Sequence, residues 1–403
     1  MLTGFDVGGA PIAPPPFPKA AVSKAAAPAK PADPTRRADR EAEPLSLDDV
    51  LANRRRGRGA LSNAAGRFEA ESRTAEPLDA ESLPDPAGFA TTVTVERPRT
   101  VITRNDSPDI SFDRSINPYR GCEHGCVYCF ARPTHAFVGL SPGLDFETKL
   151  FAKEGAADKL ERELAAAGYK PRTLAIGTNT DPYQPIERER RIMRSILEVL
   201  ERCHHPIGII TKSALVARDI DLLAPMAAKG LVKVAVSVTT LDPALARLME
   251  PRAPAPRKRL DAIRRLSEAG IPVTVMTAPL IPAVNDHEME TILQAARQAG
   301  ATEAGYVVLR LPLEVRDLFR EWLLAHFPDK LRHVMGLIQS MRDGEDYDAT
   351  WGKRMTGTGP YAWMLGRRFE IAAAKLGFPK VRAKLRTDLF RAPTPHGQQL
   401  NLF

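Results

Sequence analysis

The sequence predicts an α/β protein built on a partial parallel barrel of six β-α units. Short runs rich in Val and Ile alternate with longer amphipathic stretches between residues 173 and 311, and a further strand is expected just before Cys122. Short apolar runs of this kind are typical of parallel strands buried on both faces. Because the pattern holds six units, we expect an open or partial (β/α)6 barrel rather than a complete eightfold one.

The expected strands and helices alternate along the chain. The strands are TLAIG (173–177), PIGIIT (206–211), VKVAVSV (232–238), PVTVMT (272–277) and GYVVLRL (305–311). The helices are 187–203, 257–270 and 287–300, and the last two end in a glycine that suits the C′ position. Chemistry in parallel barrels is carried by the carboxyl ends of the strands, so site residues are expected there.

Composition divides the chain into four parts. Residues 1–95, rich in Ala, Pro and Arg, are expected to be a disordered tail, because they cannot bury enough apolar surface. Within this tail, the arginines of 53–69 suit either a phosphate backbone or a solvated linker. Residues 96–315 are the expected barrel, 316–390 a helical extension and 391–403 a flexible tail.

The chain of 403 residues has four cysteines and a formal net charge of +8. So few cysteines do not make a disulfide framework at this length, which favours a reducing compartment. The first residues lack a signal-peptide pattern, and no segment approaches 18 apolar residues. We therefore expect a cytoplasmic protein without a membrane span. The positive charge suits a nucleic-acid partner, although an arginine-rich solvated surface has the same composition.

Three of the cysteines, Cys122, Cys126 and Cys129, fall within the segment GCEHGCVYCFAR. Three thiolates on one short loop can hold three corners of a 4Fe-4S cluster and leave the fourth iron open to a ligand. Zinc is the structural alternative, with His124 as a fourth ligand. The isolated Cys203 is expected to be a small buried residue on a helix.

The cysteine spacing, with Tyr128 before the third cysteine, resembles the radical S-adenosylmethionine (SAM) superfamily over residues about 110–315. The resemblance implies a TIM-like partial barrel, a 4Fe-4S cluster and SAM as cofactors, and an electron donor such as flavodoxin or ferredoxin. It also implies that one electron from the cluster cleaves SAM to methionine and a 5′-deoxyadenosyl radical.

The same resemblance indicates which strand-end residues would bind SAM. In addition to Tyr128, they are Asn179, Thr180 and Asp181 near the amino group, Lys212 and Arg252 at the carboxylate, and Ser237 and Thr239 at the ribose or carboxylate. Ordinary strand-end hydrogen bonding or helix capping is the alternative for each of them.

Segments such as NPYRGCEHGCVYCFARPTH and GIPVTVMTAPLIPAVND resemble the DNA repair photolyase-like branch, which includes spore photoproduct lyase. In that branch a cysteine after the second strand donates hydrogen, and this chain has Thr178 at the corresponding position. Because a threonine O–H bond is too strong for that role, we expect another reaction unless Cys203, Tyr128 or Tyr183 takes it over.

Two later segments bear on partners. The glycine-rich basic stretch 348–369 suits either close approach to phosphates or a cover for the open side of the barrel. The final residues resemble the peptide that docks bacterial repair proteins on the DNA polymerase sliding clamp, with folding back onto the domain as the alternative. The docking residues would be Gln399, Leu400, Leu402 and Phe403.

These observations lead to three functional hypotheses. The first is a radical SAM enzyme that acts on nucleic acid, in DNA repair or base modification. The second keeps the cofactor chemistry but directs it to a protein or a small molecule. The third is a clamp- or nucleic-acid-binding adaptor with a structural metal site.

Overall fold

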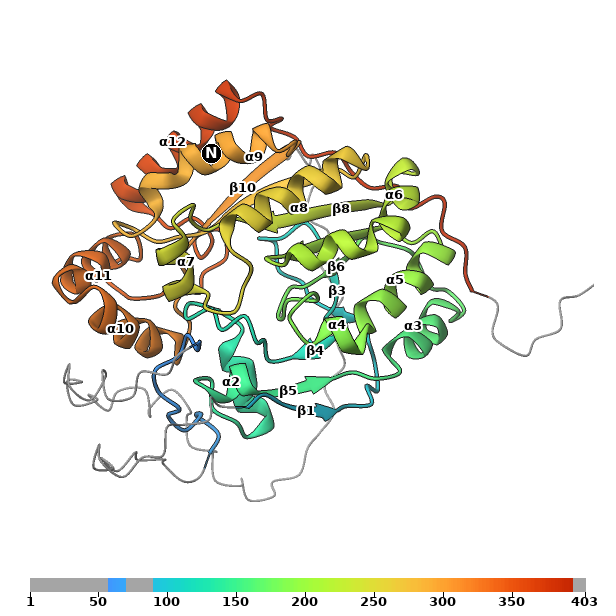
Figure 1. Cartoon of the computed structure of the whole chain (residues 1–403), viewed down its shortest axis with the longest axis horizontal. Helices are drawn as coiled ribbons and strands as arrows, with labels where there is room; N and C mark the ends of the chain where they lie inside the picture. Colours follow the sequence, from blue (N-terminus) through green and yellow to red (C-terminus); the bar gives the residue numbers. More distant parts are fainter. Residues whose placement is uncertain (1–56, 70–89, 394–403) are drawn as a thin grey trace, which may run out of the picture. The chain divides into compact units, whose positions relative to one another are not determined.

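The computed structural model describes residues 57–69 and 90–393 (Figure 1). Within these residues, the main sheet has seven strands in the order β10-β9-β8-β7-β6-β3-β2. Neighbouring strands are parallel except β2 and β3, which are antiparallel. The strands are β2 (Thr103–Arg104), β3 (Arg114–Ile116), β6 (Leu174–Ile176), β7 (Ile207–Thr211), β8 (Val232–Ser237), β9 (Val273–Leu280) and β10 (Glu303–Val308).

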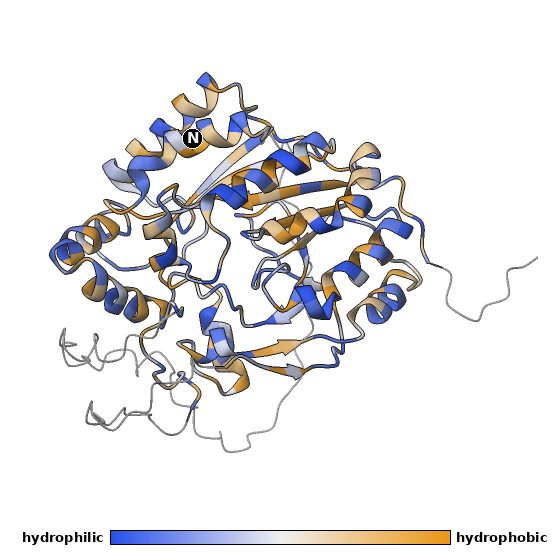
Figure 2. Cartoon of the chain, in the orientation of Figure 1, coloured by the Kyte–Doolittle hydropathy of each residue, from blue (hydrophilic) through white to orange (hydrophobic). Residues whose placement is uncertain are grey.

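The parallel strands β3, β6, β7, β8, β9 and β10 stand in the sheet in the order in which they occur in the chain. This order confirms the predicted partial (β/α)6 barrel, and each predicted apolar run overlaps one of the strands. The strand expected before Cys122 is β3. Figure 2 shows hydrophobic residues along strand β8 and more hydrophilic residues on the helix α8 that covers the sheet.

Helices connect the strands and follow the last one. They are η2 (Arg132–Val138), α2 (Asp145–Thr148), α3 (Ala156–Leu164), α4 (Glu187–Arg190), α5 (Ile192–Arg202), η3 (Ala214–Asp219), α6 (Ile220–Ala228), α7 (Pro243–Met249), α8 (Pro256–Glu268), η4 (Asp286–Glu288), α9 (Met289–Gln298), α10 (Val315–His326), η5 (Pro328–Lys330), α11 (Leu331–Ser340) and α12 (Gly359–Lys375). The predicted helix 187–203 is divided at Arg191, whose φ of 50° lies in the left-handed region.

A second sheet consists of β1 (Thr92–Val95), β5 (Lys149–Ala152) and β4 (Tyr119–Arg120). The sequence analysis missed it, because strands of two to four residues give too few alternations to form a recognisable pattern. Strand β4 ends directly before the cysteine loop, so this sheet fixes the point at which the loop begins.

The helices after β10 share a hydrophobic core with the cysteine loop. Val127 and Tyr128 belong to the same buried cluster as Phe319 and Trp322 of α10. The Trp322 indole Nε1 also donates a hydrogen bond to the Leu248 carbonyl at 2.9 Å. Helix α10 therefore supports the loop directly. No helix among the described residues is long and apolar enough to cross a membrane.

The segment 348–358 joins the two edges of the main sheet. Met355 accepts a hydrogen bond from Val308 N of β10 at 2.9 Å. On the other side, Arg354 forms an ion pair with Asp109, in the turn between β2 and β3, and Gly352 N donates to Asp109 at 2.6 Å. These contacts favour the interpretation that the segment covers the open side of the barrel.

The predicted tail 1–95 is not uniform. Residues 1–56 and 70–89 lie outside the described residues, whereas β1 and residues 57–69 are part of the folded unit. Ala60 and Leu61 are 0% and 4% exposed. The composition of a 95-residue window does not reveal this short segment, whose small residues allow close packing against the barrel.

We predict that Gly177→Ala destabilises the fold strongly. Gly177 follows β6 with φ 90°, and a Cβ there would lie 2.2 Å from the Ile210 carbonyl oxygen. Strain and overlap together are expected to lower the free energy of unfolding by about 3 kcal/mol or more. Gly208→Ala in β7 is the matched control, because its Cβ meets nothing within 4 Å. Urea denaturation measures both, and equal losses would contradict the prediction.

A second prediction concerns Glu321 of α10, which accepts a hydrogen bond from Ser62 Oγ at 3.0 Å. Burial raises the pKa of Glu321 to about 7, and the Ser62 bond opposes the rise. Because the folded pKa exceeds that of the unfolded chain, this group favours folding most at low pH, and the advantage is lost as pH rises through 7. Glu321→Gln should therefore lose less stability than the wild type between pH 5 and pH 8, by up to about 3 kcal/mol. Urea denaturation at the two pH values tests this, and an unchanged pH dependence would refute it.

Candidate functional site

The three cysteines of the loop lie together at the carboxyl ends of the strands. Cys122 and Cys126 are 7% and 8% exposed, Cys129 is partly exposed, and all three thiols are free. Burial raises the pKa of Cys122 well above its ordinary value, and the nearby Cys126 and Cys129 add to the effect. Burial also raises the pKa of Cys126 to about 12. Cys129 packs into the hydrophobic cluster of Cys122 and into that of Cys126, so the three residues lie together.

Two glycines shape the cysteine loop, one directly before Cys122 and one directly before Cys126. Gly121 and Gly125 have φ values of 73° and 65°, in the left-handed region. A Cβ at Gly121 would lie 2.8 Å from the Phe146 carbonyl oxygen, and one at Gly125 would lie 2.7 Å from a carboxylate oxygen of Glu147. Both positions require glycine, because the backbone angle is left-handed and a Cβ atom would lie too close to its neighbours.

The side chains of the loop bear on the two metal groups that the sequence suggested, a 4Fe-4S cluster and a zinc ion. Among the described residues, no three His, Cys, Asp or Glu side chains are arranged to hold a single metal ion. A cuboidal cluster places one thiolate on each of three irons, so its cysteines need not converge on one point. His124, the fourth ligand in the zinc interpretation, has Nδ1 3.4 Å from Asp181 Oδ2. Three free thiols on one loop are a donor set that suits the three protein-bound corners of such a cluster.

Asp181 joins the ends of β6 and β7 to the cysteine loop. Its carboxylate accepts hydrogen bonds from Thr211 Oγ1 and Lys212 N, both at 2.7 Å, and from Tyr183 N at 2.9 Å. Burial alone would raise the pKa of Asp181, but His124 and the bonds from Lys212 N and Thr211 Oγ1 lower it to about 2. Both carboxylate oxygens are already engaged within the chain, which suits a positioning role.

Tyr128 and Lys212, two of the predicted cofactor residues, meet at a buried ion pair. The Tyr128 hydroxyl donates to Glu250, and Glu250 forms an ion pair with Arg259. Glu250 and Arg259 are each 1% exposed. The Lys212 Nζ lies 5.7 Å from the centre of the Tyr128 ring. Burial alone would lower the pKa of Lys212, but the charges of Cys126 and Glu250 raise it above its ordinary value.

The sequence analysis missed Glu250 and Arg259. One signal was available for Arg259: it lies on the buried face of α8 with Ala262, Ile263 and Leu266. An arginine in an otherwise apolar helical stripe requires a buried partner. No comparable pattern marks Glu250, which follows the end of α7.

Two further predicted residues lie at the carboxyl end of β8: Ser237 is its last residue, and Thr239 follows two residues later. Ser237 and Thr239 are 5% and 1% exposed. The Thr239 hydroxyl oxygen has no hydrogen-bond partner among the described residues, which is unusual for a buried polar atom. An unpartnered hydroxyl at this edge fits a site that receives a polar ligand.

Loop 178–180 after β6 is held by Asn117. Asn117 Oδ1 accepts a hydrogen bond from Asn179 N at 2.8 Å, and its Nδ2 donates to Thr178 Oγ1 at 3.1 Å. Thr180 is buried and donates to the Tyr119 carbonyl at 3.2 Å. The Asn179 residue is exposed at the strand end.

Arg252 lies against the cysteine loop and is already paired. Its Nη2 is 3.1 Å from Glu123 Oε1, and its backbone N donates to the His124 carbonyl at 3.3 Å. The structure thus gives Arg252 a partner in the loop next to Cys122.

Cys203 lies away from the cysteine loop. It caps the end of α5, which precedes β7, and is therefore near the amino ends of the strands. The residue is 2% exposed, and burial raises its pKa to about 11. This position agrees with the expected small buried residue and removes Cys203 as a hydrogen donor at the loop. Gln399, Leu400, Leu402 and Phe403 lie outside the described residues.

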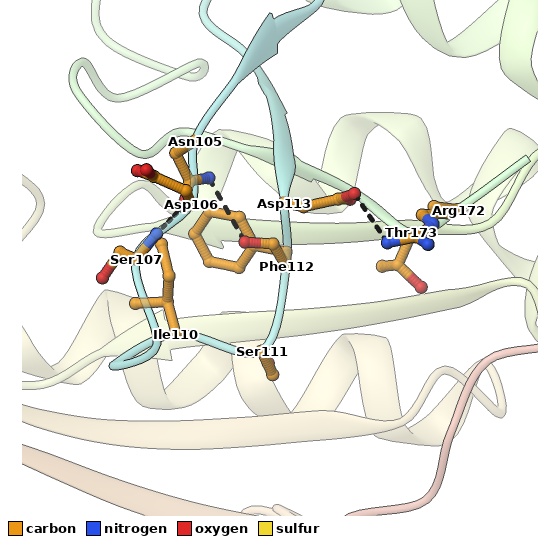
Figure 3. A pocket seen from close by; sticks show the side chains of 9 residues that line it. All are labelled: Asn105, Asp106, Ser107, Ile110, Ser111, Phe112, Asp113, Arg172 and Thr173. Carbon is orange, nitrogen blue, oxygen red and sulfur yellow. Dashed lines mark hydrogen bonds and ion pairs between the residues drawn. The ribbon is translucent and has the colours of Figure 1, made fainter. Parts of the chain in front are cut away.

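A cavity of about 390 Å³ lies at the amino ends of β3 and β6 (Figure 3). The loop between β2 and β3 forms one wall, including Phe112, and Arg172 and Thr173 lie opposite. An ion pair of 2.8 Å between Arg172 and Asp113 crosses its edge. None of the predicted site residues lines this cavity.

Comparison with known proteins agrees with this geometry. The family model described as the radical SAM superfamily matches residues 116–296. An uncharacterized protein of Mycobacterium bovis and one of Mycobacterium tuberculosis are each 38% identical over 222 residues, 55% of this chain and 65% of theirs. The chain thus spans slightly less than two thirds of the length of these relatives. An uncharacterized protein of Methanocaldococcus jannaschii is 28% identical over 43% of this chain and 62% of its own.

Among solved structures, a spore photoproduct lyase complexed with dinucleoside spore photoproduct has a similar fold, with a TM-score of 0.50. It is 14% identical, and the match covers 70% of this chain and 79% of the lyase. The matched family residues run from the last residue of β3 into α9 and include the whole cysteine loop. Residues 116–296 of this chain are therefore similar to the radical SAM superfamily.

Proposed function

We propose that this protein is a radical SAM enzyme, with a 4Fe-4S cluster on Cys122, Cys126 and Cys129 and SAM bound beside it. The observation that carries the proposal is the position of three free, neighbouring thiols at the carboxyl ends of parallel strands, inside the matched domain. When bound, the cluster would supply one electron to cleave SAM to methionine and a 5′-deoxyadenosyl radical.

The chain's own residues would bind and orient the cofactor. Lys212 is the candidate for its carboxylate, because this ammonium group lies beside the loop and keeps its proton. Thr239 offers a hydroxyl without a partner among the described residues, and the exposed Asn179 offers an amide. Asp181, Arg252 and Thr180 would act by positioning, since their polar groups already bond within the chain.

The surroundings of the loop would exclude water. Cys126, Val127 and Tyr128 belong to a buried cluster that also contains Leu309 and Trp322. A water-poor site protects a reactive intermediate and strengthens the electrostatic interactions inside it. A low-potential cluster needs a reducing compartment and a protein electron donor, so we place the enzyme in the cytoplasm with a donor such as flavodoxin or ferredoxin.

We further propose that the substrate is a nucleic acid. The fold is similar to that of a lyase solved with a dinucleoside photoproduct, and the net charge of +8 suits a polyanion. The reaction is expected to differ from spore photoproduct repair. The Thr178 hydroxyl bonds to Asn117, and a threonine O–H does not replace a thiol as hydrogen donor.

The cluster is tested by Cys126→Ala. We expect this variant to lose the brown chromophore and the formation of 5′-deoxyadenosine after anaerobic reconstitution, because one of three cluster ligands is gone. Cys203→Ala is the matched control and should keep both, because Cys203 lies at the opposite strand ends. Retention of chromophore and cleavage by the Cys126 variant would refute the assignment.

The final residues provide a separate test of the link to DNA. Deleting residues 399–403 should abolish capture by immobilised sliding clamp while 5′-deoxyadenosine formation is unchanged, because the motif QLNLF would act only as a docking peptide. A variant with Leu402→Ala and Phe403→Ala should behave in the same way. Equal capture of the full-length and shortened chains would argue against clamp docking.

A further inference from the structure

Residues 57–64, here called the strap, lie directly on the cysteine loop. A Cβ added to Gly59 would be 1.7 Å from the Gly125 carbonyl oxygen and 3.3 Å from Val127 N. Only a glycine allows the two backbones to approach this closely. Ala60 and Leu61, which follow, are buried. The strap therefore covers the part of the loop that carries Cys126.

A buried carboxylate connects the strap to the loop. Glu147 is 0% exposed and accepts hydrogen bonds from Gly59 N at 3.0 Å and Ala60 N at 2.8 Å. It also forms an ion pair of 2.5 Å with Arg132. Arg132 in turn donates from Nε to the Cys126 carbonyl at 2.9 Å. A continuous line of hydrogen bonds thus runs from the strap through Glu147 and Arg132 to Cys126.

A second line reaches the first part of the loop. Arg58 Nη2 donates to Thr91 Oγ1 at 3.2 Å, and Thr91 Oγ1 donates to Glu123 Oε1 at 2.7 Å. Glu123 follows Cys122 and also pairs with Arg252. The strap is therefore coupled to both sides of the cysteine cluster loop.

The far end of the strap is fixed to the segment after η2. Ser62 O accepts a hydrogen bond from Leu144 N at 3.2 Å, and the Asn63 amide donates to Asp145 at 3.0 Å. Gly143 is also close, since a Cβ there would lie 2.2 Å from Ser62 O. The strap is thus held at a place that does not touch the cysteines.

We infer that the strap and Glu147 position the cysteine loop for cluster binding, with Glu147 as the positioning residue. This inference rests on the proposed function. A buried carboxylate is stable only when its oxygens are paired, and two of the donors to Glu147 come from the strap. With the strap in place, Arg132 is held against the Cys126 carbonyl, so the loop is ordered before metal arrives. A loop that is already ordered loses less conformational entropy when it binds the cluster.

The first test uses the full-length protein without metal and follows alkylation of individual cysteines by mass spectrometry. Gly59→Ala should separate strap and loop, so we expect Cys126 to react with iodoacetamide at least about tenfold faster. Cys203 is the internal reference and should keep its wild-type rate. Gly336→Ala controls for the added methyl group, because its Cβ meets nothing within 4 Å.

Gly143→Ala should displace the strap from its other side and reproduce the effect, because the added methyl group would lie against Ser62 rather than against a cysteine. Unchanged Cys126 reactivity in both variants would overturn the inference. Equal acceleration of Cys203 would also overturn it, because the strap would then stabilise the whole chain rather than the loop.

The second test follows the cluster. After reconstitution, Gly59→Ala and Glu147→Gln should lose the brown absorbance in air several-fold faster than the wild type and Gly336→Ala. Equal rates of absorbance loss in all four proteins would contradict the inference about the strap but not the proposed function. A wild-type protein that binds no cluster would contradict the proposed function, whereas the alkylation result would still report on the contact between strap and loop.

Discussion

The position of the cysteine loop depends on buried carboxylates, because the loop has little regular secondary structure of its own. Asp181 holds it from the strand ends, Glu147 from the strap, and Glu250 through Tyr128. A buried charge is costly unless it is paired and hydrogen-bonded, so each carboxylate restricts its partners to a narrow range of positions. A loop of ordinary flexibility is thereby held in one conformation before any ligand binds.

Two cations near Cys126 favour the thiolate form that the proposed cluster would need. Without metal, burial raises the pKa of Cys122 and Cys126, which favours the neutral thiols. Lys212 and Arg259 act on Cys126 in the opposite direction, since their positive charges lower its pKa. Two cations beside a buried thiolate reduce the free-energy cost of burying its charge. The negative charge of Glu250 offsets the repulsion between these two cations, and they in turn lower its pKa. Lys212 and Arg259 are therefore the groups that would compensate the negative charge of a thiolate at Cys126.

The sequence predicted the barrel because the parallel strands from β6 to β9 are short runs of mainly apolar residues that are largely buried. It also indicated the cysteine loop and the strand ends, since these depend on local spacing. The strap, Glu147 and Glu250 could not be predicted in this way, because their roles arise from contacts between residues far apart in the chain. Helix α12 lies within the predicted helical extension 316–390, but its start was expected to be a glycine-rich stretch, because its first residues are glycine and proline, which are typical of loops.

The most direct test of the central claim is electron paramagnetic resonance on anaerobically reconstituted, dithionite-reduced protein, recorded with and without SAM. We expect a 4Fe-4S signal that changes when SAM is added, because the account leaves one iron without a protein ligand. Formation of 5′-deoxyadenosine in the same sample should accompany the change. A protein that takes up zinc and shows no such signal, or a cluster signal that SAM leaves unchanged, would contradict the account.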